Sequence, residues 1–274
     1  MPELPEVETV KRSLEPLVKD KTISDVEIFY GGIIKYPQPE KFKEMICGRK
    51  IIDINRRGKY LLFNLEDNNT LVIHLRMTGQ LTVCDRNTSM GKHTHLVFHI
   101  SSEHDLRFTD IRKFGMIYLV STGDWCRIIG LQNLGYEPLS KEFNLEAIEK
   151  LIVGSKGLIK HFLLKQSNIA GIGNIYADEI LFSAGIHPKR NIQTLAQSEI
   201  ENLYNAIKQK LEEGIKYRGT SFSDYVDGRG KKGGFQEKLY VYGRGGKPCL
   251  KCGALLEKSV IAGRGTVFCP KCQG

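Results

Sequence analysis

Hydrophobic positions in the first third of the chain recur with the spacing of half-buried β-strands. In the first such segment, Val26, Ile28 and Tyr30 fall on alternate positions. The pattern predicts short strands, for example over residues 22–30, 60–65, 70–75, 95–100 and 116–120. Many short strands at this spacing favour a β-sandwich or a barrel.

One helix is predicted ahead of these strands. Pro5 suits a first helical position, and Glu6 and Glu8 suit the positive end of a helix. The apolar residues that share one face of this helix are Val7, Val10 and Leu14.

The hydrophobic spacing changes near residue 135, where Gly135, Pro138 and Ser140 interrupt the strands. A domain boundary is therefore expected there. Beyond it, apolar residues recur three or four positions apart, which predicts helices over 145–151, 159–164, 176–182 and 198–215. Residues 217–234 are rich in Gly, Ser, Asp and Lys, a composition typical of a mobile loop or linker.

Charge adds the first functional indication. The 274 residues carry a formal charge of +9. Twelve Lys and Arg against four Asp and Glu lie between Lys216 and Gly274, so the excess is concentrated there. Such a basic segment favours a polyanion such as nucleic acid, with a solvated basic surface as the alternative. The first residues lack the pattern of a secretory signal and no apolar run reaches membrane length, so a cytoplasmic protein without membrane contact is expected.

Four of the seven cysteines form two C-x-x-C pairs, Cys249 with Cys252 and Cys269 with Cys272. The sixteen residues between the pairs match a four-cysteine zinc site. Four thiolates leave no open position on the ion, so one structural Zn²⁺ is predicted. Small buried hydrophobic positions are expected for the remaining cysteines, Cys47, Cys84 and Cys126.

Residues 259–262 and 266–268, between the cysteine pairs, are typical of the arms of a hairpin whose tip is Gly263-Arg264-Gly265. An arginine held there suits contact with a phosphate, and a solvated side chain is the alternative. Removal of Met1 would leave Pro2 with a free secondary amine, which is a nucleophile near neutral pH, and the adjacent Glu3 could move protons. On these residues alone, however, Pro at position 2 is common and is usually an ordinary start of the chain.

Six further motifs stand in order along the chain: Met1-Pro2-Glu3-Leu4-Pro5-Glu6-Val7-Glu8-Thr9, Arg57-Gly58-Lys59-Tyr60, His74-Leu75-Arg76-Met77, Asp110-Ile111-Arg112-Lys113-Phe114-Gly115, Ala170-Gly171-Ile172-Gly173-Asn174-Ile175-Tyr176 and the cysteine hairpin with Arg264. Together they closely resemble the bacterial formamidopyrimidine-DNA glycosylases, from the first residue to the last. The related endonuclease VIII branch typically has Gly where this chain has Leu4, which favours the purine-directed branch.

The resemblance implies a multidomain α+β protein. An N-terminal catalytic β-sandwich would span residues 1–135, a helix-two-turn-helix domain 136–235 and a C-terminal β-hairpin zinc finger 236–274. Residues 217–234 would form a loop that caps the lesion. Damaged double-stranded DNA would be the partner of a monomer located at the bacterial nucleoid. The expected activity is excision of 8-oxoguanine and formamidopyrimidines followed by lyase cleavage.

The resemblance also assigns roles to residues. Pro2 would form an imine with the sugar, with Glu3, Lys59 and Arg264 as the other catalytic residues. Met77, Arg112 and Phe114 would fill the gap left by the flipped nucleotide, although a core position is the alternative for Met77 and Phe114. Further DNA contacts are implied for His74, His93, Lys156, Asn174, Tyr242 and Arg264.

Two local features of the motifs carry expectations of their own. Gly171 and Gly173 would let the backbone approach a phosphate, with Asn174 as the cap of the next helix. Arg218 stands where many relatives have a glycine, which puts the geometry of the capping loop in question. Oxidised pyrimidines remain an alternative substrate, and a binder of damaged DNA without catalytic activity is the alternative from another class.

Overall fold

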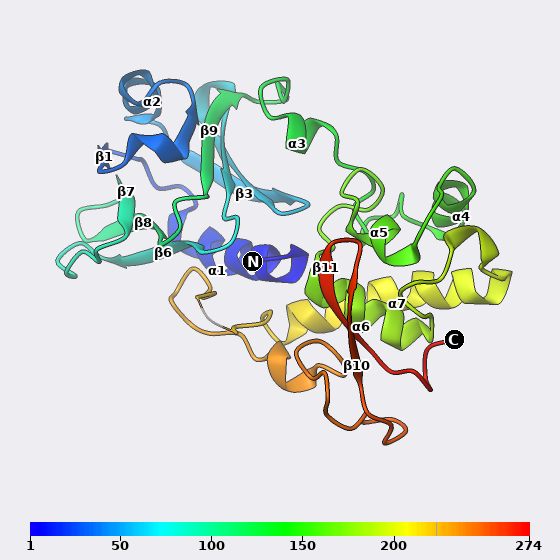
Figure 1. Cartoon of the computed structure of the whole chain (residues 1–274). Coiled ribbons are helices and arrows are strands. Elements are labelled where there is room, and N and C mark those ends of the chain that lie inside the picture. Colours follow the sequence, from blue (N-terminus) through cyan, green and yellow to red (C-terminus); the bar gives the residue numbers. More distant parts are fainter. Residues whose placement is uncertain (223) are drawn as a thin grey trace. The chain divides into compact units, whose positions relative to one another are not determined.

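A computed structural model describes residues 1–222 and 224–274 (Figure 1). The chain divides into two compact units. The first contains Met1–Gln132 and Tyr217–Gln236, and the second contains Asn133–Lys216 and Glu237–Gly274. The second unit begins close to the expected boundary at residue 135. Residues 217–234 belong to the first unit.

The first unit is a β-sandwich of two sheets. The four-stranded sheet has the order β1 (Asp25–Ile28), β7 (Thr94–His99), β8 (His104–Asp110), β6 (Gly79–Asp85). The five-stranded sheet has the order β2 (Ile34–Tyr36), β9 (Met116–Ser121), β5 (Asn69–His74), β4 (Tyr60–Leu65), β3 (Ile51–Arg57). Neighbouring strands are antiparallel except β2 and β9, which are parallel. Apolar side chains from both sheets form one core.

All five predicted strands are present, as β1, β4, β5, β7 and β9. The first is shorter than expected, because β1 ends at Ile28 and Tyr30 lies outside it, 39% exposed. Strands β2, β3, β6 and β8 were not among the predicted segments. In β3 the pairing shifts register between Ile51 and Asp53, so the buried Ile51 and Ile54 stand three positions apart and hide the alternation.

Helix α1 (Leu4–Val18) confirms the predicted N-terminal helix, with Pro5 at its second position. The N–H of Glu3 donates to Glu6 Oε2 (2.8 Å), one half of a capping box. The apolar face of α1 is fully buried and packs on β3, β4 and β6. The unit also contains α2 (Pro39–Ile46), α3 (Ile129–Gln132) and short 3₁₀ turns at Gly31–Ile33 and Glu66–Asn68.

The segment Tyr217–Gln236 is anchored on α1, although its composition predicted a mobile loop. Glu6 Oε1 accepts hydrogen bonds from the N–H (2.7 Å) and the hydroxyl (3.0 Å) of Thr220. The hydroxyl of Tyr225 donates to the Glu6 carbonyl (3.2 Å), and its ring belongs to the sandwich core. Gly228 N–H donates to Ser13 Oγ (2.8 Å). The described part of this loop is therefore tied to the helix that begins at the N-terminus.

The second unit contains all four predicted helices and a hairpin. They are α4 (Leu145–Val153), α5 (Ile159–Leu164), α6 (Asn174–Ala184), α7 (Gln197–Lys216), β10 (Glu257–Ile261) and β11 (Arg264–Phe268), with a 3₁₀ turn at Ile192–Thr194. A further 3₁₀ turn, Phe235–Lys238, has its first two residues in the first unit and its last two in the second. Helices α6 and α7 pack closely at Gly214, where a Cβ would lie 2.4 Å from the hydroxyl of the buried Tyr176. Among the described residues, no helix is long and apolar enough to cross a membrane.

The hairpin is fixed to the helices by a buried ion pair. Lys160 on α5 donates to Asp178 Oδ1 on α6 (2.6 Å) and to Thr266 Oγ1 on β11 (2.6 Å). Asp178 Oδ2 also accepts from the N–H of Val267 (3.1 Å). Both charged side chains are fully buried, and burial raises the pKa of Asp178 to about 6 even beside the ammonium group.

The three cysteines outside the two pairs are not the fully buried residues that were expected. Cys47 and Cys84 are half-buried, and Cys126 is exposed. Cys47 packs at the edge of the sandwich core. Burial raises the pKa of Cys47 and Cys84, so their thiols are less acidic than usual.

The buried pair yields a prediction about stability. Lys160→Met and Asp178→Asn should each destabilise the zinc-loaded protein by about 3–5 kcal/mol, because each leaves one charge or its partners uncompensated. The double variant should lose clearly less than the sum of the two. Urea unfolding followed by fluorescence measures all three.

Lys150→Met is the matched control, since Lys150 forms an exposed ion pair with Glu146 on α4 (2.6 Å). It should leave the unfolding midpoint unchanged. Additive losses for Lys160 and Asp178 would contradict the coupling.

Candidate nucleic-acid interface and metal centre

The N-terminal residues Pro2 and Glu3 are both buried at the start of α1. Met1 is half exposed, at 51%. The positive end of the α1 dipole lies next to these residues. The predicted nucleophile and its acid/base partner therefore occupy one ordered position rather than a free chain end.

Lys59 lies in the tight turn between β3 and β4, where Gly58 has a positive φ of 54°. The turn is braced on α1, because Arg56 pairs with Glu8 (2.9 Å) and donates to the Gly58 carbonyl (3.0 Å). Burial opposes ionisation of Glu8, but hydrogen bonds from Arg12 and Arg56 lower its pKa overall. Lys59 itself is only 7% exposed, so it is not a solvated lysine at a sheet edge.

His74, at the end of β5, is held as a neutral imidazole. Its Nδ1 accepts the backbone N–H of Arg76 (2.9 Å), and its ring meets that of Tyr60 edge-on, with centroids 4.5 Å apart. Burial, together with the charges of Arg76 and Lys59, lowers the pKa of His74 to about 3. Because Nδ1 is an acceptor, the proton of the neutral ring is on Nε2, which is a donor suited to a phosphate oxygen.

The three predicted gap-filling residues form one exposed cluster. Arg112 Nη1 donates to Met77 Sδ (3.2 Å), and the Arg112 guanidinium lies over the Phe114 ring, 4.6 Å from its centroid. Met77 is 42% exposed and Phe114 49% exposed. The alternative that these two side chains belong to the core is therefore wrong.

Asp110 organises the turn that carries Arg112 and Phe114, and sequence reasoning missed it. Its fully buried carboxylate accepts from Thr78 Oγ1 (2.5 Å) and from the N–H groups of Arg112 (3.2 Å) and Gly115 (2.7 Å). Any larger residue at Gly115 would clash, since a Cβ there would lie 2.5 Å from the Phe108 ring. The feature that could have identified Asp110 is an acidic residue, buried, directly before an exposed turn with basic and aromatic residues.

In the second unit, Asn174 and the hairpin residue Arg264 are brought together. Asn174 Nδ2 donates to the carbonyl of Gly265, next to Arg264 (2.8 Å). The prediction that Asn174 caps α6 is wrong: Gly173 is the N-cap and Asn174 is the first helical residue. The hairpin turn is Ala262-Gly263, both with positive φ, so the exposed Arg264 is the first residue of β11 rather than the centre of the tip.

Glu179 is a second buried acid that sequence reasoning missed. Its carboxylate accepts the backbone N–H groups of Tyr240 (2.9 Å), Val241 (2.9 Å) and Tyr242 (2.9 Å). Burial raises the pKa of Glu179. Three successive donors on one carboxylate fix the backbone at Tyr242, which was a predicted DNA contact.

The remaining predicted contacts lie on loops. His93 is half-buried before β7, and Lys156 is exposed between α4 and α5. Arg218 adopts the positive φ (64°) that a glycine would favour. Its guanidinium pairs with the fully buried Asp227, whose Oδ1 also accepts from the N–H groups of Arg229 (2.9 Å) and Lys231 (2.9 Å). The loop thus keeps a glycine-like backbone at Arg218 with an ion pair to support it.

The four paired cysteines converge as predicted. Their sulfur atoms all lie within 4.8 Å of one another, with Sγ separations of 4.0 Å for Cys249 and Cys272 and 3.5 Å for Cys252 and Cys269. A tetrahedral Zn²⁺ with Zn–S bonds of about 2.3 Å requires sulfurs about 3.8 Å apart. The donor set and its geometry therefore fit one structural zinc ion, whose role is to join the two ends of the hairpin segment.

Comparison with known proteins defines the class of this fold and site. Family models match residues 1–117 as the formamidopyrimidine-DNA glycosylase N-terminal domain, 134–226 as its H2TH domain, and 246–274 as the zinc finger found in FPG and IleRS. A formamidopyrimidine-DNA glycosylase of Pelotomaculum thermopropionicum is 46% identical over 273 residues, which cover 100% of this chain and 99% of the relative.

Solved structures agree with this class. The complex of a Lactococcus lactis FPG mutant with DNA containing Fapy-dG has a TM-score of 0.92 and 38% identity, covering 99% of each chain. A complex of the wild-type Lactococcus lactis FPG with DNA containing an oxidized pyrimidine has a TM-score of 0.91, 38% identity and the same coverage. The chain belongs to the formamidopyrimidine-DNA glycosylase family, whose members are bifunctional DNA glycosylases and AP lyases of base excision repair.

His74 yields a pH prediction. In ¹⁵N-histidine NMR spectra, its ring should stay neutral and protonated on Nε2 from pH 8 down to pH 5. The unfolded chain takes up this proton near pH 6.5, whereas the folded chain does so only near pH 3. The stability that neutral His74 contributes is therefore complete above about pH 6.5 and is lost as the pH falls toward 3.

The same sample in concentrated urea provides the control, because all of its histidines should titrate near pH 6.5. A folded-state titration of His74 in that range would show that the ring is not held as described.

Proposed function

We propose that this enzyme excises oxidised purines from duplex DNA and then cleaves the exposed backbone, with the amine of Pro2 as nucleophile. The observation that carries the proposal is the exposed cluster of Met77, Arg112 and Phe114, in the same unit as the ordered N-terminus. An aliphatic chain, a guanidinium and an aromatic ring are suited to replace an extruded base and to bond to its orphaned partner.

The chemistry needs few groups. The Pro2 nitrogen attacks C1′ of the sugar and loses its proton, the bond from C1′ to the base breaks, and the departing base takes a proton. The C1′–O4′ bond then breaks as O4′ takes a proton, which leaves an iminium between Pro2 and C1′. The iminium withdraws electrons, which allows β- and then δ-elimination of the two phosphates. Glu3 is assigned as the acid and base at the sugar, and Lys59 as an aid to proton transfer and a phosphate ligand.

Phosphate contacts are assigned to side chains from both units. In the first unit these are the Nε2–H of His74 together with His93. In the second they are Lys156, Asn174, Tyr242 and Arg264, with Arg264 also acting in catalysis. The described part of residues 217–234 would cap the extruded base, and Arg218 there has the positive φ that a glycine would favour. The division into domains at 1–135, 136–235 and 236–274 is part of the same proposal.

The expected partner is damaged double-stranded DNA, bound by a monomer. The proposed location is the bacterial cytoplasm, at the nucleoid. The basic excess between Lys216 and Gly274 supports a polyanionic partner.

Oxidised pyrimidines are a second candidate substrate class. The complex of Lactococcus lactis FPG with DNA containing an oxidized pyrimidine supports it. Leu4, by its resemblance to the purine-directed branch, supports the first candidate.

A covalent trap tests the nucleophile. Incubation with an 8-oxoguanine duplex and borohydride should reduce the iminium and give one protein–DNA adduct, provided that intact mass shows Met1 to be absent. A variant with one extra residue before Pro2 is the matched control, because its amine lies within a peptide bond. This variant should bind the duplex and form no adduct. If the enzyme without the extra residue cleaves the duplex but gives no adduct, Pro2 is not the nucleophile.

Single-turnover assays on matched duplexes separate the two substrate classes. We expect 8-oxoguanine opposite cytosine to be excised at least tenfold faster than thymine glycol, a difference of about 1.4 kcal/mol in activation free energy. Equal rates, or the reverse order, would move the assignment to oxidised pyrimidines. A protein that binds both duplexes and cuts neither would be a binder only.

A further inference from the structure

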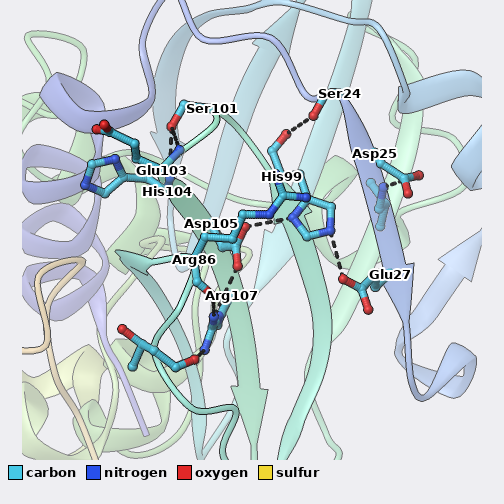
Figure 2. A network of polar contacts seen from close by, with 12 residues as sticks. Ser24, Asp25, Glu27, Arg86, His99, Ser101, Glu103, His104, Asp105 and Arg107 are labelled. Atoms are coloured by element: carbon cyan, nitrogen blue, oxygen red, sulfur yellow. Dashed lines mark hydrogen bonds and ion pairs between the residues drawn. The ribbon is translucent and has the colours of Figure 1, made fainter.

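A row of four polar side chains spans three strands of the four-stranded sheet of the first unit (Figure 2). Glu27 on β1 contacts His99 Nε2 on β7 (2.8 Å), and Asp105 on β8 contacts His99 Nδ1 (2.7 Å). Asp105 then pairs with Arg107, also on β8 (3.1 Å). The His99 ring therefore lies between two carboxylates, and the second of these also contacts the Arg107 guanidinium.

The row ends in the loop of residues 86–93, which joins β6 to β7 and is here called the β6–β7 loop. The Arg107 guanidinium donates to three of its backbone carbonyls, those of Arg86 (3.1 Å), Thr88 (2.8 Å) and Ser89 (3.5 Å). Arg107 is only 7% exposed, and its Nε is buried with no hydrogen-bond partner among the described residues. An unsatisfied buried donor lowers stability, so an apolar residue would serve a purely stabilising role better.

The β6–β7 loop that Arg107 fixes has the charge of a phosphate-binding segment. It contains Arg86, Lys92 and His93 and no acidic residue. Arg86 and Lys92 are exposed. At its other end, the carbonyl of His93 accepts the N–H of Asp110 (2.9 Å), the residue that organises the turn of Arg112 and Phe114. The loop is therefore held at one end by Arg107 and at the other by the site already described.

We propose that Arg107 is a positioning residue that holds the β6–β7 loop so that Lys92 contacts a DNA phosphate. The Glu27–His99–Asp105 row keeps the Arg107 guanidinium in place. This proposal rests on the proposed function, because it adds a contact to the same DNA-binding site. Its distinctive consequence is that Arg107 and Lys92, one buried and one exposed, act on DNA affinity as one unit.

The experiment measures the Kd of the zinc-loaded enzyme for a lesion-bearing duplex at several salt concentrations. Lys92→Ala removes one phosphate contact, so the slope of log K against log salt should fall by about 0.9, and binding at about 0.1 M salt should weaken roughly eightfold. Arg107→Met should give a similar loss. The double variant should be no weaker than either single variant, since a released loop no longer presents Lys92.

Arg49→Met is the matched control. Arg49 also lies in the first unit, donates to a backbone carbonyl, that of Met45 (3.2 Å), and pairs with Asp67. Like Arg107→Met, this variant removes one positive charge, but Arg49 does not hold the β6–β7 loop. It should therefore keep the wild-type slope of log K against log salt. Excision rates at saturating DNA separate the effects further, because a positioning role in binding acts mainly on Kd.

Two results would overturn the proposal. One is a Lys92→Ala enzyme with the wild-type Kd and salt slope, which does not depend on whether Arg107→Met folds. The other is a double variant whose loss of DNA affinity equals the product of the two single losses, which would mean that Arg107 and Lys92 act separately. Failure of the proposed function would look different, since the wild-type enzyme itself would then neither bind nor cut the lesion-bearing duplex.

Discussion

One buried carboxylate, that of Glu6, joins the parts of the first unit on which the chemistry depends. Its two oxygens accept the N–H of Glu3 and both donors of Thr220. The start of the chain, the first turn of α1 and the segment from Tyr217 to Gln236 therefore share a single acceptor group. The negative charge also lies at the positive end of a helix, where it is stabilised. This arrangement also fixes the position of Pro2, because the next residue, Glu3, is held by the hydrogen bond from its N–H to Glu6 and by the hydrogen bond that its carbonyl accepts from Val7.

Buried acids perform the same task elsewhere in the molecule. Asp110 fixes the turn of the exposed cluster, and Glu179 fixes the backbone at Tyr242. In each case the carboxylate accepts backbone N–H groups, which define a chain path more strictly than side-chain packing does. The exposed basic and aromatic residues are thus presented on backbone that the interior determines. This arrangement explains why these acids are buried while the exposed cluster and Tyr242 lie on loops and turns.

Much of the fold and site could be predicted from the sequence, since the signals were local or came from a resemblance. The spacing of apolar residues predicted α1 and the four later helices, and the cysteine spacing predicted the zinc site. Strand β3 was missed because its register shift breaks the alternation. Asn174 was misplaced by one residue because Gly173, with extended backbone, is the N-cap. Glu6, Asp110, Glu179 and Arg107 gain their roles from partners distant in sequence, which no local pattern records.

The zinc hairpin has a mechanical consequence. The cysteines gather at one end of the segment and Arg264 stands near the other, at the start of a five-residue strand. Such a strand is roughly 17 Å long, so it behaves as a stiff arm with the metal at its base. The Lys160–Asp178 pair grips this arm at Thr266 and Val267, close to the guanidinium. Oxidation of a cysteine at the base would therefore free one end of the arm while the other stayed clamped, and a tilt rather than detachment would follow.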